Sequence, residues 1–76
     1  MKELIEYIVK ALVDDPGTVD IKEVAGDKIT IFELRTAKSD IGKVIGKHGR
    51  TAGAIRTILN AVSARKGKRA VLEIVE

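Results

Sequence analysis

Apolar residues recur at helical spacing at the start of the chain. The positions concerned are Leu4, Ile5, Ile8, Val9 and Leu12, with charged residues between them. This spacing predicts an amphipathic helix over residues 2–13 whose apolar face packs into the core. The sequence Asp14-Asp15-Pro16-Gly17 ends the helix, because the residue before a proline is driven out of the helical conformation.

Two stretches rich in Val, Ile and Thr follow, over residues 18–25 and 28–36. They flank Gly26-Asp27, which predicts a β-hairpin with a two-residue primed turn and glycine first. In this register Ala25 opposes Lys28. One face of the hairpin then carries Val19, Ile21, Phe32 and Leu34 and should pack against the helices, while Val24, Ile29 and Ile31 lie on the other face.

Helical spacing returns in the second half of the chain. Ser39 is the expected N-cap of a short helix that ends at Gly46, and a longer helix should run from Gly49 to a C-terminal glycine at Gly67. Alternating residues over 69–75 predict a third strand. Since two helices separate the last two strands, these strands can pair in parallel. The predicted fold class is therefore α+β, ordered α-β-β-α-α-β, with a three-stranded mixed sheet and helices on one face.

Composition narrows the classes of function. A chain of 76 residues has room for one domain, expected at 1–76, and for a small core. It has no cysteine and one histidine, and no pair of carboxylates lies near the glycine turn, so no catalytic residue, metal site or cofactor is predicted. The absence of a long apolar run argues against a signal peptide or a membrane span, and a cytoplasmic protein is expected.

The net charge of +3 is concentrated in one part of the chain. Residues 38–69 hold nine Lys/Arg and one acidic residue, for +8, whereas residues 1–37 carry −3 and residues 70–76 carry −2. The basic segment contains Ile45-Gly46-Lys47-His48-Gly49-Arg50. Two glycines this close let the backbone bend tightly and approach another molecule, and the helix that follows directs its unpaired N–H groups to the same place. The combination indicates a site for a polyanion.

A Walker-type phosphate loop explains this stretch less well. Only three residues separate Gly42 from Gly46, where the motif needs four, and His48 replaces the Ser or Thr that would hold magnesium.

The order of elements and the turn together resemble the type II KH domain. The KH core pattern is a Val/Ile-Ile-Gly-x-x-Gly run followed by an aliphatic residue in the next helix. It is matched by Val44-Ile45-Gly46-Lys47-His48-Gly49 and by Ile55. The match covers nearly the whole chain, which is most similar to the small stand-alone bacterial single-KH proteins of the KhpA family. The resemblance implies a non-catalytic RNA-binding protein, an RNA chaperone or post-transcriptional regulator, that forms a homodimer or a complex with a second KH-containing protein.

The resemblance also implies where single-stranded RNA binds. The Gly46–Gly49 loop would clamp about four unpaired nucleotides. The predicted RNA-binding residues are Lys43, Val44, Ile45, Gly46, Lys47, His48, Gly49 and Arg50, with a rim of Ile41, Arg65, Lys66, Lys68 and Arg69. The sequence does not show which of Ile41, Val44 and Ile45 line the RNA-binding groove and which pack in the core. It also does not distinguish single-stranded RNA from single-stranded DNA as the ligand.

Two other functions stay open on the sequence alone. Residues 40–46 and 50–66 fit the two helices of a helix-turn-helix DNA-binding module, although the flanking strands and the small residues that begin the second helix argue against it. The basic face also fits a protein-interaction module with an acidic partner. Because Tyr7 and Phe32 are the only aromatic residues, a platform for base stacking is not expected.

Overall fold

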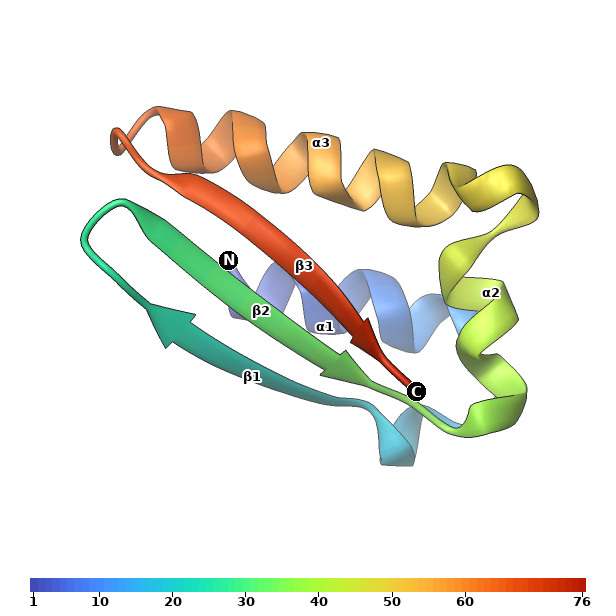
Figure 1. The fold of residues 1–76 in the computed structure, drawn as a ribbon. Helices are drawn as coiled ribbons and strands as arrows, with labels where there is room; N and C mark the ends of the chain where they lie inside the picture. Colours follow the sequence, from blue (N-terminus) through green and yellow to red (C-terminus); the bar gives the residue numbers. More distant parts are fainter.

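The computed structural model describes residues 1–76 and has the predicted order of helices and strands (Figure 1). The elements are α1 (Lys2–Leu12), β1 (Asp20–Ala25), β2 (Ile29–Arg35), α2 (Ile41–Ile45), α3 (Arg50–Ala64) and β3 (Arg69–Val75). Short 3-10 turns lie at Pro16–Thr18, Lys38–Asp40 and Lys47–Gly49. None of the helices is long and apolar enough to cross a membrane.

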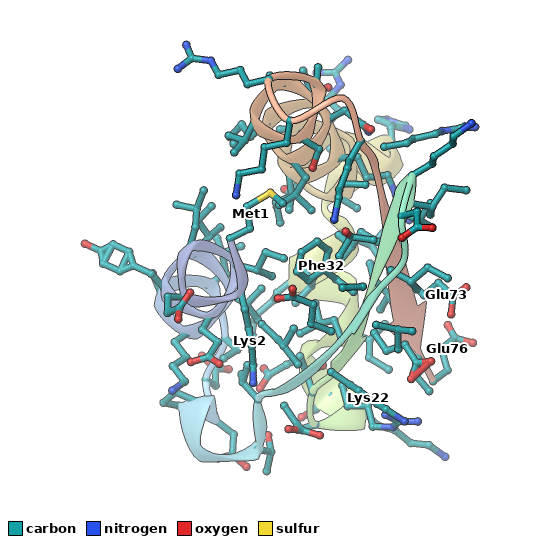
Figure 2. All side chains as sticks on the ribbon, turned by 90° about the vertical axis from the view of Figure 1, so that its left-hand side faces the viewer. Met1, Lys2, Lys22, Phe32, Glu73 and Glu76 are labelled. Carbon is teal, nitrogen blue, oxygen red and sulfur yellow. The ribbon has the colours of Figure 1, made fainter.

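The three strands form a mixed sheet in the order β1-β2-β3. The strand β1 runs antiparallel to β2, and β3 runs parallel to β2 after the crossover through α2 and α3 (Figure 1). The helices α1 and α3 lie on the same side of the sheet, while Glu73 and Glu76 project from the other side (Figure 2). The predicted α+β class and mixed sheet are confirmed.

The core fills the space between the helices and the sheet. Its buried members are Ile5, Val9 and Val13, Ile21, Phe32 and Leu34, Val44, Ile55 and Leu59, and Ala70 and Leu72. Phe32 on the central strand is fully buried and points toward the helices (Figure 2). The predicted inner face of the hairpin is therefore correct. On the opposite face Val24 and Ile29 are exposed and Ile31 is half-buried.

The predicted register of the hairpin is wrong by two residues. Ile21 pairs with Leu34 and Ala25 pairs with Thr30. The turn residues are Asp27 and Lys28, closed by a hydrogen bond of 2.8 Å from the Gly26 N–H to the Ile29 carbonyl. None of these residues has a positive φ, so the turn is not of the primed type. The residues on the inner and outer faces were still predicted correctly, because a shift of two residues leaves every side chain on the same face of the sheet.

Glycine at position 26 serves packing rather than turn geometry. A Cβ atom there would lie 2.9 Å from the Ile29 carbonyl oxygen, the acceptor that closes the turn. Gly26 therefore belongs to the pair with Ile29 that closes the turn and is not the first turn residue.

Candidate nucleic-acid interface

The glycine turn joins α2 to α3 and contains three residues with positive φ. Gly46 ends α2 with φ 78° and ψ 169°, His48 has φ 58° and ψ 26°, and Gly49 has φ 72° and ψ 13°. A hydrogen bond of 3.1 Å from the Gly49 N–H to the Gly46 carbonyl closes the turn. His48 is the only non-glycine residue with positive φ, a conformation that histidine tolerates better than most residues do.

The two glycines differ in what surrounds them. A Cβ atom on Gly46 would lie 2.2 Å from Oγ1 and 2.9 Å from the backbone nitrogen of Thr51. A Cβ atom on Gly49 would meet nothing within 4 Å. The first glycine thus lets the start of α3 pack directly against the turn, while the second leaves open space beside the backbone. Thr51, which the sequence analysis did not select, is the residue that fixes this packing.

The basic side chains of the turn are exposed and unpaired. Lys47, His48 and Arg50 all lie on the surface, and no ion pair or side-chain hydrogen bond holds any of them. No side chain caps the N-terminus of α3, which begins at Arg50. Free cations and the positive end of a helix dipole therefore share one exposed turn, an arrangement that suits a phosphate group.

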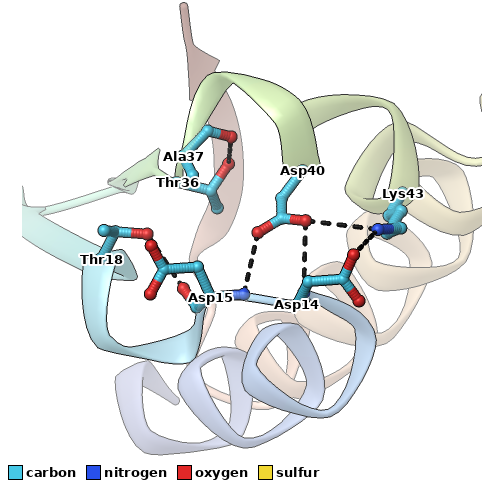
Figure 3. Close-up of polar contacts among 7 residues, drawn as sticks. All are labelled: Asp14, Asp15, Thr18, Thr36, Ala37, Asp40 and Lys43. Carbon is cyan, nitrogen blue, oxygen red and sulfur yellow. Dashed lines mark hydrogen bonds and ion pairs between the residues drawn. The ribbon is translucent and has the colours of Figure 1, made fainter.

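Lys43 lies near this turn, but its ammonium group is already paired with two carboxylates. Its Nζ contacts the carboxylate of Asp14 and lies 3.4 Å from Oδ1 of Asp40 (Figure 3). The hydrogen bond to Asp14 raises the pKa of Lys43 against the opposing effect of burial, and the charge and hydrogen bond of Asp40 add to the rise. The side chain of Lys43 is thus directed toward α1 rather than toward the turn.

The start of α2 differs from the sequence prediction. Ser39 does not cap the helix, because it lies inside the 3-10 turn Lys38–Asp40 and the residue before α2 is Asp40. Asp40 makes no capping hydrogen bond to its own helix either. Its carboxylate accepts hydrogen bonds from the N–H groups of Asp14 and Asp15 instead (Figure 3). Burial opposes ionisation of Asp40, but these two bonds and Lys43 outweigh it and hold the pKa of the carboxyl below its usual value.

The aliphatic residues of α2 separate into two groups that the sequence could not distinguish. Val44 is fully buried in the core, so it supports α2 and is no contact for a ligand. Ile41 and Ile45 are half-buried and remain accessible in part. Val44, one of the predicted RNA contacts, is therefore a core residue instead.

The second group of basic residues lies at the far end of α3. Arg65, Lys66 and Arg69 are exposed and Lys68 is half-buried. Gly67 has φ 68°, and hydrogen bonds from the Gly67 N–H to Ala64 and from the Lys68 N–H to Ser63 end the helix as the sequence predicts. Since α3 has 15 residues, about 22 Å separates this basic turn from the glycine turn at 1.5 Å per residue.

Two polar residues of α3 reach the free edge of β3. The guanidinium of Arg56 donates to the Leu72 carbonyl at 3.3 Å, and the Ala70 N–H donates to the side-chain oxygen of Asn60 at 3.2 Å. The edge of β3 is thereby tied to α3 between the two basic turns. Sequence reasoning missed both residues, because polar side chains four positions apart on a helix usually face solvent. The one available signal was their place beside the apolar stripe of Ile55 and Leu59.

No enclosed pocket and no group of three potential metal ligands is present. The surface that runs from the glycine turn along α3 is therefore open.

Comparison with known proteins identifies the family. The family model described as "KhpA/KhpB, KH domain" matches residues 2–74. This chain belongs to that KH family. The proteins named "RNA-binding protein KhpA" from Chlamydia pneumoniae and Clostridium acetobutylicum are 57% and 51% identical to it. The first alignment covers 100% of this chain and 97% of the relative, and the second covers 99% of this chain and 100% of the relative.

A third KhpA family member, from Borreliella burgdorferi, is 51% identical over 97% of this chain and 90% of its own length. It carries the same name as the other two. These relatives are named for RNA binding and not for a catalytic activity. No solved structure matches the chain.

Proposed function

We propose that this chain is a single KH domain over residues 1–76 that binds single-stranded RNA in the cytoplasm as an RNA chaperone or post-transcriptional regulator. In this role the turn Gly46–Gly49 clamps the backbone of about four unpaired nucleotides. The observation that carries the proposal is the pair Lys47 and His48, exposed and unpaired between two positive-φ glycines. The shared name of the relatives supports RNA as the ligand.

The turn supplies three features that a phosphate group requires. The open space beside Gly49 lets a sugar-phosphate backbone approach the main chain. The uncapped start of α3 offers N–H groups and a positive dipole end. Lys47 and Arg50 add positive charge that no acidic side chain neutralises.

The path of the RNA follows α3 from the glycine turn to the rim at Arg65–Arg69. The separation of about 22 Å between these turns suits a short single strand held at both ends. Arg56 lies on this path. Its guanidinium donates one hydrogen bond to the Leu72 carbonyl, and the residue is exposed. The half-buried Ile41 and Ile45 offer apolar surface near the turn. Without aromatic stacking partners, sequence preference is expected to be loose.

A helix-turn-helix function is less well supported by this geometry. The first helix of such a module crosses the DNA backbone, whereas α2 has only five residues and serves as a link between the core and the turn. The residues that begin α3 after Arg50 are Thr51, Ala52 and Gly53, which offer few groups for reading base edges.

We also propose that the protein associates with a second KH-containing chain, either a copy of itself or a protein of the KhpB type named by the family model. Ile58 and Val62 on α3 are 44% and 36% exposed. At 100° per residue they fall on the flank of α3 opposite Arg56 and Asn60. A partner on this apolar flank would leave the proposed path of the RNA free. Light scattering on the wild type and on Ile58→Asp tests a homodimer, since the variant should be a monomer.

The ligand class is tested by fluorescence anisotropy with equal lengths of single-stranded RNA, duplex RNA, single-stranded DNA and duplex DNA. Single-stranded RNA should bind most tightly. For three to four phosphate contacts, the logarithm of affinity should fall with the logarithm of salt with a slope of about −2 to −3. Tighter binding of duplex DNA, or a slope near zero, would contradict the proposal.

A further inference from the structure

Asp40 is the only buried carboxylate of the protein, with 1% of its surface exposed. It lies at the start of α2, one short helix before the glycine turn, and it makes no contact with the turn itself. A buried carboxylate is costly unless it is hydrogen-bonded and paired with positive charge. The partners of Asp40 therefore indicate what the residue holds in place.

These partners come from a distant part of the chain. Oδ1 of Asp40 accepts a hydrogen bond of 3.2 Å from the Asp14 N–H, and Oδ2 accepts one of 3.1 Å from the Asp15 N–H. Lys43, one turn further along α2, lies between the carboxylates of Asp14 and Asp40 (Figure 3). The two backbone contacts thus fasten the start of α2 to the segment that leaves α1, whereas the ion pair between Lys43 and the exposed Asp14 adds little.

The helix α2 depends on such contacts for its orientation. It has five residues, too few for a stable helix without tertiary contacts. Val44 is its one buried side chain, and Gly46 follows directly at its C-terminal end. At 1.5 Å per residue, Asp40 lies about 6 Å before Val44. Only Ile45 separates Val44 from Gly46, where the glycine turn begins. A tilt of α2 about Val44 would therefore change the direction in which the chain enters the turn at Gly46.

We propose that Asp40 is a positioning residue for the glycine turn. Its carboxylate fixes α2 against the end of α1 and so presents Lys47 and His48 in the geometry that receives RNA. The inference rests on the proposed binding of RNA through this turn. A site that is held in its bound geometry loses less freedom when the ligand arrives, so release of α2 weakens binding without removing any group that touches the RNA.

The test compares Asp40→Asn with Asp14→Asn. The first variant keeps the shape of the side chain, but its amide nitrogen cannot accept a hydrogen bond from a backbone N–H. The second variant removes one charged partner of Lys43 and leaves both N–H contacts of Asp40 in place, so it is the matched control. Two quantities are measured on folded protein: the NMR amide shifts of Gly46, His48 and Gly49 without RNA, and the affinity for single-stranded RNA.

Asp40→Asn should shift the amide resonances of the turn and weaken RNA binding about three- to thirtyfold, a range typical of residues that act through a packed network. The slope of affinity against salt should stay at the wild-type value, because no phosphate contact is lost. Asp14→Asn should change neither the resonances nor the affinity. A residue with a purely structural role would lower the unfolding temperature and leave the turn and the affinity unchanged, and that result would overturn the inference.

Two further variants keep the outcomes separate. If Asp40→Asn does not fold, Asp40→Glu keeps the charge but places it one methylene further out. It should move the same amide resonances, and unmoved resonances would overturn the inference. Lys47→Asp/His48→Asp tests the turn directly. If this double variant binds RNA like the wild type, the proposed function fails; if it loses binding while folded Asp40→Asn keeps full affinity, only the positioning role fails.

Discussion

The two glycines of the turn should respond very differently to alanine. At Gly46, φ 78° with ψ 169° is a conformation that only glycine adopts readily, and a new Cβ would lie 2.2 Å from Oγ1 and 2.9 Å from the backbone nitrogen of Thr51. The backbone conformation costs about 1–3 kcal/mol, and the overlap costs about 1–3 kcal/mol more because a backbone atom cannot rotate away. Gly46→Ala should therefore destabilise the fold by about 4 kcal/mol.

At Gly49 only the conformation matters. Its φ of 72° is left-handed, but a Cβ atom there has open space around it. Gly49→Ala should cost about 1–2 kcal/mol. Gly53 lies inside α3, also with open space, so Gly53→Ala should stabilise the protein by about 0.5–1 kcal/mol and serves as a control for the added methyl group.

Urea unfolding followed by far-UV circular dichroism measures all three changes. A chain of 76 residues has a total stability of roughly 4–11 kcal/mol, so Gly46→Ala should be partly or wholly unfolded while Gly49→Ala stays folded. Equal losses in the two variants would refute the reasoning that the Thr51 contact distinguishes them.

Three further predictions concern a side chain of the turn, the buried carboxylate of Asp40 and a core residue of α3. Lys47→Met should reduce the salt slope for single-stranded RNA by about 0.7, whereas Lys43→Met should leave it unchanged because Asp14 and Asp40 already neutralise Lys43; equal changes would place Lys43 on the RNA. Because the pKa of Asp40 is lowered in the folded protein, its ionised carboxylate stabilises the fold at pH values above the ordinary carboxyl pKa of about 4. This stability is lost as the pH falls through the lower pKa of the folded state. Acid unfolding should therefore be less steep in Asp40→Asn, and parallel curves would contradict this. Ile55→Asp buries an unpaired charge at a site that is 3% exposed and should unfold the protein by circular dichroism; a folded variant would contradict the placement of Ile55 in the core.

Periodicity predicted the helices, the strands and the mixed sheet because each element buries one face. The register of the hairpin escaped prediction because Gly26 was interpreted as the first residue of a primed turn. In the structure Gly26 belongs to the closing pair, where a Cβ atom would meet the Ile29 carbonyl. A local pattern cannot distinguish a glycine needed for φ from a glycine needed for space.

The candidate site was predictable where it is local in sequence. The turn from Gly46 to Arg50 is one continuous segment in which Lys47, His48 and Arg50 are exposed. Asp40 escaped prediction because its partners lie 25 and 26 positions away in the chain. The roles of Lys43 and Arg56 depend on the same kind of long-range contact, with Asp14 and with Leu72. Such contacts require the three-dimensional fold.

The central claim is that Lys47 and His48 form the RNA contact. Its most direct test is a titration of one single-stranded RNA against wild type, Lys47→Asp/His48→Asp, and the control Lys10→Asp/Lys22→Asp. The control introduces two aspartates at exposed positions outside residues 38–69. The turn variant should stay folded and lose at least about tenfold in affinity, since it replaces charge-assisted contacts with repulsion, and the control should lose much less. Wild-type affinity in the folded turn variant, or equal losses in both variants, would contradict the claim.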